Sequence, residues 1–523
     1  MVSKESSINK MLIVILYALL FSVTYLLLFS FGGKNASAAL SLSGSGTYSN
    51  PYKISSPADL KKFRDYVNNG NTMSGQYIEL TCDIDMNNEP FICIGYTRTG
   101  NNSKDYSFNG IFDGKNHVLQ NLTLQSSTGD QYSSFPNGGL FANTDGATIK
   151  NLMLSNVSAN DFGWFCGALV GDANNTTIEN VIVLSGSINN PTAIGDYATG
   201  GIVGYAHDGT SINLCKNYAS VSCETSGYRA VAGGIVGAIG AKLNGVGDPI
   251  YSSASISKCG NFGSVVANSI TLYDAYAGGV AGYAGCNIEN CFNQGTINSN
   301  SNNNSVKNTA YAGGIVGYSN STCVNCYNTG AVSGGYVFEE KSDSYVIKSG
   351  FLGIGQKTAK ISLIYSTKTK TSSINGYIDA TVTNCYSTYS VSKKPLFLLT
   401  LKENDTVCFN NHNCSSSKTY TFSNDYYFKS AALADPDYRH RQPTYSLMIT
   451  IYSDSSQSTA KKSFVYTQQP LNKNGTELPS SSLQSDLPSG FSSDVWAIYT
   501  SIDNGYPHFK GKYWVDYSET PDA

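Results

Sequence analysis

A short glycine-containing box recurs through most of this 523-residue chain, and it restricts the fold more than any other feature. Successive boxes start 29 to 45 residues apart. One such unit is too short to bury its own apolar face, whereas stacked units can bury theirs, so the repeat predicts a solenoid. The boxes are GGLFA (138–142), GALVG (167–171), GGIVG (200–204), GGIVG (233–237), GGVAG (278–282), GGIVG (313–317) and SGFLG (349–353).

A second box follows each glycine box and contains two apolar columns three residues apart. Between them an Asn is frequent, and Asn tolerates the left-handed backbone that a bend between two inward-pointing residues needs. The first column is Leu119, Ile149, Ile178, Ile212, Ile256, Ile288, Cys323 and Val382. The second column is Leu122, Leu152, Val181, Cys215, Cys259, Cys291, Cys326 and Cys385. The Asn residues are Asn121, Asn151, Asn180, Asn290, Asn325 and Asn384.

This pattern predicts an all-β protein, a right-handed parallel β-helix in which each coil has two or three short strands and a variable outer loop. The handedness rests on the general preference of parallel crossovers. Leucine-rich repeats are the competing solenoid, but the glycine box and the absence of helical spacing disfavour them.

The cysteines occupy apolar positions of the repeat. A free Cys packs as a small hydrophobe, so we expect a buried, reduced ladder of Cys215, Cys259, Cys291, Cys326 and Cys385. A four-thiolate zinc site is the alternative, and it would be built from Cys286, Cys291, Cys323 and Cys326. Exported proteins usually pair their thiols, so disulfides between Cys82 and Cys93 and between Cys408 and Cys414 are also expected.

The N-terminus has the features of a targeting segment. Lys4 and Lys10 precede an apolar run over residues 11–31, and a small-residue site follows that favours cleavage between Ala38 and Ala39. The run is also long enough to stay in a bilayer as a signal anchor. We therefore expect a secreted or cell-surface protein that contacts a membrane only through residues 1–38, if these stay uncleaved.

The ends of the stack need covers because bare strand edges invite aggregation. Ser56 and Pro57 begin a helix expected over residues 57–69, with Leu60, Phe63 and Val67 on its buried face and Gly70 as its stop. The predicted domains are a cap with the first coils (44–125), the repeat stack (126–391), an irregular β-rich region (392–490) and a closing strand with a tail (491–523).

The sequence contains few residues that could form a catalytic, metal-binding or nucleic-acid-binding site. The formal charge of −3 gives no electrostatic reason to expect nucleic acid. No His pair has metal-ligand spacing, and no catalytic residue, cofactor or metal is expected. Asn143 to Gly146 (NTDG) resembles one box of the polygalacturonases, but it stands where a turn is required. Asp83, Asp85 and Asp113 suggest calcium or, more simply, polar turns, and Arg439 to Arg441 suggests solvated surface.

The boxes resemble GLUG-motif repeats of secreted and surface-attached proteins, and so do the lead-in GSGTYSNPYKISSPADLKKF and the ending VWAIYTSIDNGYPHF. The resemblance covers residues 44–391 and about the last thirty residues. It implies a noncatalytic extracellular module, presumed adhesive, without a residue-level site. We therefore expect a β-solenoid that binds an extracellular glycan or protein. A β-helix polysaccharide lyase or hydrolase and a structural surface spacer are the alternatives.

Overall fold

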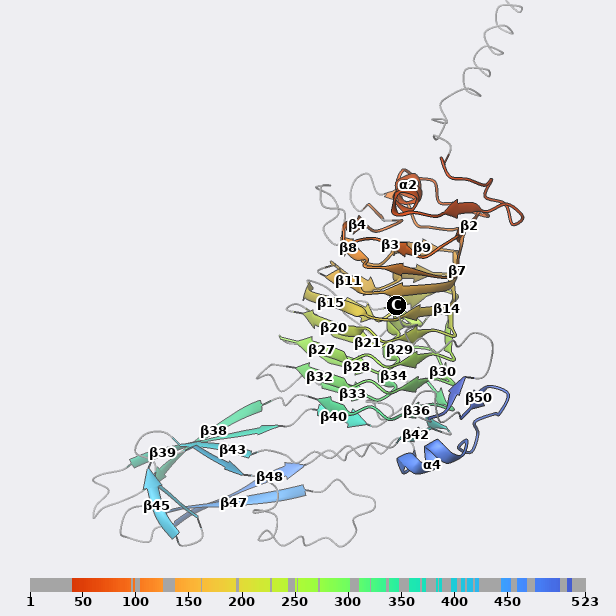
Figure 1. The fold of residues 1–523 in the computed structure, drawn as a ribbon. Helices are drawn as coiled ribbons and strands as arrows, with labels where there is room; N and C mark the ends of the chain where they lie inside the picture. The colour runs from red at the N-terminus through yellow and green to blue at the C-terminus, as the bar shows by residue number, and fades with distance from the viewer. Residues whose placement is uncertain are drawn as a thin grey trace, which may run out of the picture. The chain divides into compact units, whose positions relative to one another are not determined.

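The computed structural model describes most of the chain between residues 40 and 509 (Figure 1). The predicted cleavage site and the basic cluster at 439–441 lie outside the described residues. No helix of the described part is long and apolar enough to cross a membrane. Described are residues 40–95, 97–98, 104–125, 137–160, 162–193, 197–225, 228–242, 250–251, 253–270, 273–301, 310–319, 321–334, 338–347, 357–366, 369–372, 382–383, 385–387, 397–401, 406–409, 412–416, 419–422, 444–452, 459–467, 476–498 and 506–509.

The repeats form a stack of coils whose strands pair in parallel with those of the next coil (Figure 1). Each full coil contributes to four sheets, which we number in the order that the chain visits them. The glycine box joins sheet 1 to sheet 2, and the second box forms sheet 3. The prediction of an all-β parallel β-helix is confirmed. Each coil has more strands than expected because the segments before the glycine box and after the second box are also extended and paired.

Sheets 1 and 2 flank the glycine box. Sheet 1 consists of β12 (Phe165–Gly167), β16 (Tyr197–Gly200), β21 (Ala230–Gly233), β28 (Ala275–Gly278), β33 (Ala310–Gly313) and β40 (Thr369–Ser372). Sheet 2 consists of β9 (Phe141–Asp145), β13 (Val170–Asn174), β17 (Val203–His207), β22 (Val236–Ile239), β29 (Ala281–Ala284) and β34 (Val316–Ser319).

Sheets 3 and 4 complete the coil. Sheet 3 consists of β1 (Tyr52–Ile54), β2 (Tyr77–Leu80), β3 (Ile84–Asp85), β7 (Ile111–Gln120), β10 (Thr148–Ser155), β14 (Thr177–Val183), β18 (Thr210–Asn213), β19 (Lys216–Asn217), β25 (Ala254–Ser257), β26 (Gly260–Asn261), β30 (Ile288–Glu289), β31 (Phe292–Asn293), β35 (Cys323–Val324), β36 (Tyr327–Asn328), β41 (Val382–Thr383), β42 (Tyr386–Ser387) and β49 (Thr476–Glu477). Sheet 4 consists of β4 (Pro90–Ile92), β8 (Thr123–Gln125), β11 (Val157–Asn160), β15 (Gly186–Ala193), β20 (Ser220–Thr225), β27 (Val265–Ser269), β32 (Ile297–Ser301) and β37 (Val332–Gly334).

The bend expected inside the second box is present. Ile149, Ile178, Ile212, Ile256, Ile288, Cys323 and Val382 lie in register across sheet 3. Two residues later the backbone is left-handed in coil after coil, as predicted for Asn. The φ angles there are 52° at Asn151, 53° at Asn180, 55° at Leu214, 51° at Lys258, 52° at Asn290 and 52° at Asn325. The predicted Asn384 lies outside the described residues.

Leu119, the first residue predicted for the first column, does not belong to it. Ile149 pairs with Phe112 rather than with Leu119, and Leu119 pairs with Leu154. The strand β7 bulges at its centre, where Lys115 and Asn116 have positive φ, so the sequence VLQNLTL follows the bend that Asn151 makes in the next coil. Asn121 is left-handed as predicted, with a φ of 56°, but it is level with Asn156, whose φ is 50°. Asn121 therefore lies next to Asn156, whose amide donates to the Asn121 Oδ1 at 2.7 Å.

The N-terminal cover is the predicted helix α2 (Pro57–Asn68). The Ser56 side chain accepts a hydrogen bond from the Asp59 backbone N–H at 3.2 Å, and Leu60, Phe63 and Val67 are buried. The Phe63 ring lies 5.7 Å from that of Phe108, in the first coils. This helix therefore covers the first end of the core.

Strands within the predicted repeat stack (126–391) also pair outside the coils. An antiparallel sheet joins β38 (Phe338–Ile347), β39 (Lys357–Ser366), β43 (Phe397–Leu401) and β46 (Thr419–Phe422), so the chain leaves the stack before residue 391. The stack resumes at β40, where Ser372 pairs with Gly313. The box SGFLG (349–353) lies outside the described residues. A stack can extrude an insertion of any length, because only the returning strand must match its neighbour.

Shorter elements complete the described chain. They are the antiparallel pairs of β5 (Thr97–Arg98) with β6 (Lys104–Asp105), β23 (Ala241–Lys242) with β24 (Ile250–Tyr251), β44 (Thr406–Phe409) with β45 (His412–Ser416), β47 (Thr444–Tyr452) with β48 (Thr459–Thr467) and β50 (Trp496–Ala497) with β51 (His508–Phe509), and the helix α4 (Ser480–Ser485). The closing segment packs on sheet 3: Trp496 and Phe509 are buried with Phe292 and Tyr327, whose hydroxyl donates to the Pro507 carbonyl at 2.6 Å.

Candidate functional site

The glycine box is built around a buried ladder of amides that the sequence reasoning missed. Asn217, Asn261, Asn293 and Asn328 lie on sheet 3 of successive coils and are fully buried. Each of the first three donates from Nδ2 to the Oδ1 of the next, at 3.0, 2.8 and 2.8 Å. Each also donates to the carbonyl two residues on, for example Asn293 to Gly295 at 2.8 Å. A signal existed, because the four second boxes that end at residues 217, 261, 293 and 328 all end in Asn.

In three of the boxes the second glycine lies against this ladder. A Cβ at Gly201, Gly234 or Gly279 would collide with the side chain of Asn217, Asn261 or Asn293 and with a backbone carbonyl of the next coil. The glycine pair and the asparagine are therefore parts of one structural device. The device holds the coils in register and has no free group for chemistry.

The predicted cysteine ladder lies in the core. Cys215, Cys259, Cys291 and Cys326 are fully buried, Cys385 is nearly so, and all five are free thiols. The Cys291 backbone N–H donates to the Cys326 Sγ at 3.4 Å. Burial raises the pKa of Cys259 and Cys326, and contact with neighbouring thiols raises it further, so these groups are not poised to act as nucleophiles.

The predicted disulfide between Cys82 and Cys93 is not formed in this structure. Both thiols are free, and they bond to different carbonyls, Cys82 to Ser55 at 3.3 Å and Cys93 to Gln125 at 3.6 Å. The two cysteines are close in sequence, but β4 leads Cys93 into sheet 4, whereas Cys82 lies between β2 and β3 of sheet 3. Burial raises the pKa of Cys93 to about 12. Cys408 and Cys414 lie in β44 and β45, and their side chains are outside the description.

The residues considered for metals are engaged with other partners. In the described chain no group of three or more His, Cys, Asp or Glu side chains is arranged to hold an ion, so neither the zinc set nor the calcium set is assembled. Asp83 lies 3.0 Å from His117, Asp85 accepts from Asn121 at 2.9 Å, and Asp113 accepts from Asn151 at 3.1 Å.

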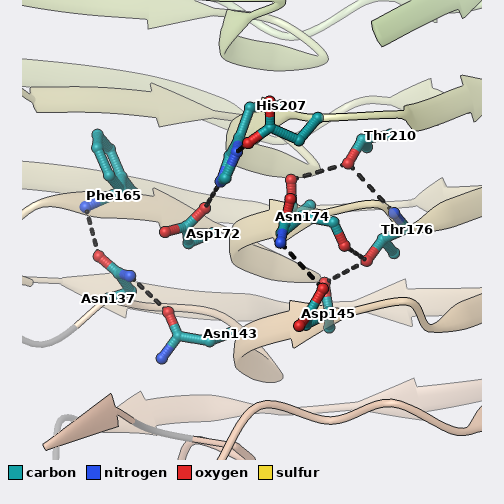
Figure 2. A network of polar contacts seen from close by, with 12 residues as sticks. Asn137, Asn143, Asp145, Phe165, Asp172, Asn174, Thr176, His207 and Thr210 are labelled. Carbon is teal, nitrogen blue, oxygen red and sulfur yellow. Dashed lines mark hydrogen bonds and ion pairs between the residues drawn. The ribbon is translucent and has the colours of Figure 1, made fainter. Parts of the chain in front are cut away.

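Figure 2 shows a polar network on sheet 2 that includes the NTDG turn. Asn143 accepts from Asn137 at 2.6 Å, and Asp145 accepts from Asn174 at 2.9 Å. Gly146 has a φ of 76°, as a turn requires. The NTDG residues therefore hold the turn, as the simpler interpretation predicted.

A histidine between two carboxylates lies in the same network (Figure 2). The His207 Nε2 lies 3.0 Å from Asp172 Oδ1, and its Nδ1 lies 2.7 Å from Asp208 Oδ2. Burial lowers the pKa of His207, but the hydrogen bonds and charges of Asp172 and Asp208 outweigh it, and the pKa is raised. The ring stacks on Tyr205, with centroids 4.6 Å apart. This cluster is the nearest approach to an acid–base site in the described chain.

Exposed aromatic rings lie along one edge of the stack, at the turn from sheet 4 to sheet 1. We call Trp164, Tyr228 and Tyr273 the edge row; Trp164 immediately precedes β12, whereas Tyr228 and Tyr273 lie two residues before β21 and β28. Trp164 is 41% exposed and Tyr273 is 38% exposed, while Tyr228 stacks on Tyr273 with ring centroids 5.3 Å apart. Ile270 on the same edge is 41% exposed. Single exposed hydrophobics are ordinary, but several on one edge indicate a contact surface.

Comparison with known proteins supports the architecture. The family model of the GLUG motif matches residues 273–298. This range begins at Tyr273 and runs through the glycine pair, Asn293 and the start of β32, so it spans about one coil.

Two further similarities are limited. Halomucin from Haloquadratum walsbyi is 30% identical over 195 residues, which cover 35% of this chain and 2% of halomucin. The chain thus spans a small fraction of the length of that relative. A crystal structure of a candidate immunoglobulin A1 protease from Bacteroides ovatus has 18% identity and a TM-score of 0.38, over 89% of this chain and 94% of that one. The TM-score is too low to support an argument. From its fold and its matched motif, the chain is a parallel β-solenoid that carries the GLUG motif.

Proposed function

We propose that this protein is a noncatalytic, secreted or cell-surface β-solenoid that binds a glycan or protein ligand outside the cell. The observation that carries the proposal is the edge row, which presents Trp164 and Tyr273 on a rigid stack. Tyrosine and tryptophan supply flat apolar area with a polar handle, at little cost in conformational entropy. The N-terminal segment supports export. The GLUG match and the similarity to halomucin are compatible with a place at the cell surface.

The test compares binding of the mature protein to glycan arrays and to whole cells with that of two variants. Trp164→Ala combined with Tyr273→Ala should reduce binding at least roughly tenfold, because both exposed rings are lost. Tyr218→Ala is the matched control, because Tyr218 is 36% exposed at the turn after sheet 3, on another edge. Equal binding by all three proteins, or none by the wild type, would contradict the proposal.

A second candidate function is a polysaccharide lyase or hydrolase, and the His207 cluster favours it. A carboxylate such as Asp172 can orient a histidine that moves a proton. Uronate polymers incubated with the protein would then yield unsaturated product or new reducing ends, and His207→Gln would abolish the yield. Absence of product from the wild type would leave the binding function as the better proposal.

A further inference from the structure

Buried polar atoms without a hydrogen-bond partner are concentrated on the inner faces of sheets 4 and 1. In the described chain they include both amide atoms of Asn190 and the hydroxyls of Thr199, Ser269 and Ser301. These four residues are at most 1% exposed. A buried polar group without a partner costs free energy, and proteins seldom keep one unless water or an ion completes its hydrogen bonds. This part of the core is therefore a candidate binding site.

Asn190 and Thr199 belong to the same coil and share a neighbour. Asn190 on β15 pairs across sheet 4 with Cys223, which is also fully buried. Burial raises the pKa of the Cys223 thiol, and the nearby Thr199 hydroxyl lowers that pKa by a smaller amount. The hydroxyl and the thiol do not meet in hydrogen-bond geometry, since the hydroxyl has no partner. The three side chains therefore lie around one place between the two sheets.

The core cluster next to these residues is almost entirely apolar. Apart from Cys223, the buried cluster between sheets 4 and 1 consists of Ala, Val and Ile side chains. Two coils later, Ala267 takes the position of Asn190 and Ala277 takes that of Thr199. The fold therefore does not need a polar side chain at either position, yet this coil has one at both.

A polar residue in the same column can find a partner inside the protein. Three coils after Asn190, the same position holds Ser299, which is fully buried. The Ser299 hydroxyl donates to the Ala275 carbonyl at 3.0 Å. Asn190 has no such bond, although its amide has more donors and acceptors to satisfy. A partner for Asn190 would therefore come from outside the chain.

The unpaired atoms select the kind of molecule that fits. The amide oxygen of Asn190 needs a donor and its Nδ2 group needs an acceptor, while the Thr199 hydroxyl can serve as either. A cation would satisfy the oxygens and leave the Nδ2 group unpaired, and an anion would do the reverse. A small neutral molecule that both donates and accepts is required. Water meets this condition, and a buried water makes about three hydrogen bonds to groups that are otherwise unpaired.

We propose that Asn190 and Thr199 bind internal water between sheets 4 and 1. The water bonds to the amide of Asn190 on one side and to the Thr199 hydroxyl on the other, so it links two sheets of one coil. Neither the edge row nor its ligand is involved, and the site is independent of the proposed function.

High-resolution crystals of the full mature chain test the site directly. An ordered water is expected within about 3 Å of an Asn190 amide atom and of the Thr199 hydroxyl. In solution, magnetic relaxation dispersion of the water oxygen nucleus measures internal water that exchanges slowly. Asn190→Leu and Thr199→Val should each lower the dispersion amplitude by the contribution of at least one molecule. Ser299→Ala is the matched control and should leave the amplitude unchanged, because the Ser299 hydroxyl is bonded to the backbone.

Circular dichroism with thermal melting would verify that each variant is folded. If Asn190→Leu does not fold, Thr199→Val still decides the question, since valine has nearly the shape of threonine. An amplitude that neither variant lowers would overturn the proposal, and so would a crystal structure without an ordered molecule beside the amide. Soaking the crystals in a rubidium salt distinguishes an ion from water. An anomalous signal at the site would identify a monovalent cation and would also overturn the proposal.

Discussion

Two coils of the same stack treat one position of the glycine box differently. In the box GALVG, the second residue is Ala168, which is fully buried. In that coil, the position of sheet 3 that pairs with the ladder residue Asn217 is Val183. In the box GGIVG at 233–237, Gly234 takes the same place, and the equivalent sheet 3 residue is Asn261. The box tolerates a methyl group where the facing residue is aliphatic and excludes it where the facing residue belongs to the amide ladder.

This comparison shows that the glycine is needed for packing rather than for backbone freedom. No positive φ is found at Gly234 or Gly279. A Cβ at Gly279 would collide with Asn293 and with the Gly314 carbonyl. Gly139 lies in a coil without a ladder amide, but a Cβ built there would still lie 2.7–3.0 Å from backbone atoms. Close approach between coils is therefore a second reason why this position needs glycine.

The largest expected effect is that of Gly234→Ala. The new methyl group would meet a backbone carbonyl and a hydrogen-bonded amide, neither of which can move alone, so we expect a loss of about 4 kcal/mol in the free energy of unfolding. Urea denaturation followed by circular dichroism measures it. The control Ala168→Gly should cost only about 1 kcal/mol. Equal costs for the two changes would show that the ladder does not decide which residue the box accepts.

A smaller effect is expected when the ladder itself is interrupted. Asn261→Leu leaves the Asn217 amide without its acceptor and Asn293 without one donor, both fully buried, and should cost about 3 kcal/mol. The same denaturation experiment applies, with Val183→Leu as the apolar exchange in the coil without a ladder, expected to cost less than about 2 kcal/mol. If Asn261→Leu leaves the free energy of unfolding unchanged, aliphatic residues can replace the amides, as they do in the first coils.

The buried thiols should make the later coils sensitive to alkali. Burial raises the pKa of Cys223 from 9.0 to about 11, so between these values the unfolded chain loses a proton that the folded chain keeps. Stability due to this group is therefore complete below pH 9.0 and falls as the pH rises toward about 11, by about 1 kcal/mol for each pH unit.

Denaturation midpoints measured across that range test this prediction. Cys223→Ala should reduce the steepness of the decline, whereas Cys82→Ala, at a partly exposed thiol, should not. A decline of the same steepness in all three proteins would locate the alkali sensitivity elsewhere, for example in tyrosines.

The smallest effect is a gain. Leu214 has a φ of 55° at the bend that Asn occupies in other coils, and this conformation is unfavourable for Leu. Leu214→Asn should therefore raise the free energy of unfolding by about 1 kcal/mol. Thermal melting would detect it, and Asn180→Leu should cause a loss of similar size. A loss with Leu214→Asn would show that the side-chain packing of Leu214 outweighs its backbone strain.

Local patterns in the sequence determined the parts of this protein that depend on neighbouring residues. The columns through Ile178 and Cys291, the left-handed Asn180 and the cap of α2 at Ser56 all follow from repeat period, backbone preference and capping chemistry, and each is found as predicted. Such features survive because every coil repeats the same local rule.

Contacts between coils were decided only by the tertiary structure. The pairing of β33 with β40 across an insertion, the bulged register of β7, the separate environments of Cys82 and Cys93, and the approach of Tyr228 to Tyr273 depend on which strand lies next in the stack. Sequence separation says little about this, because loops of very different length close onto the same rung at similar cost.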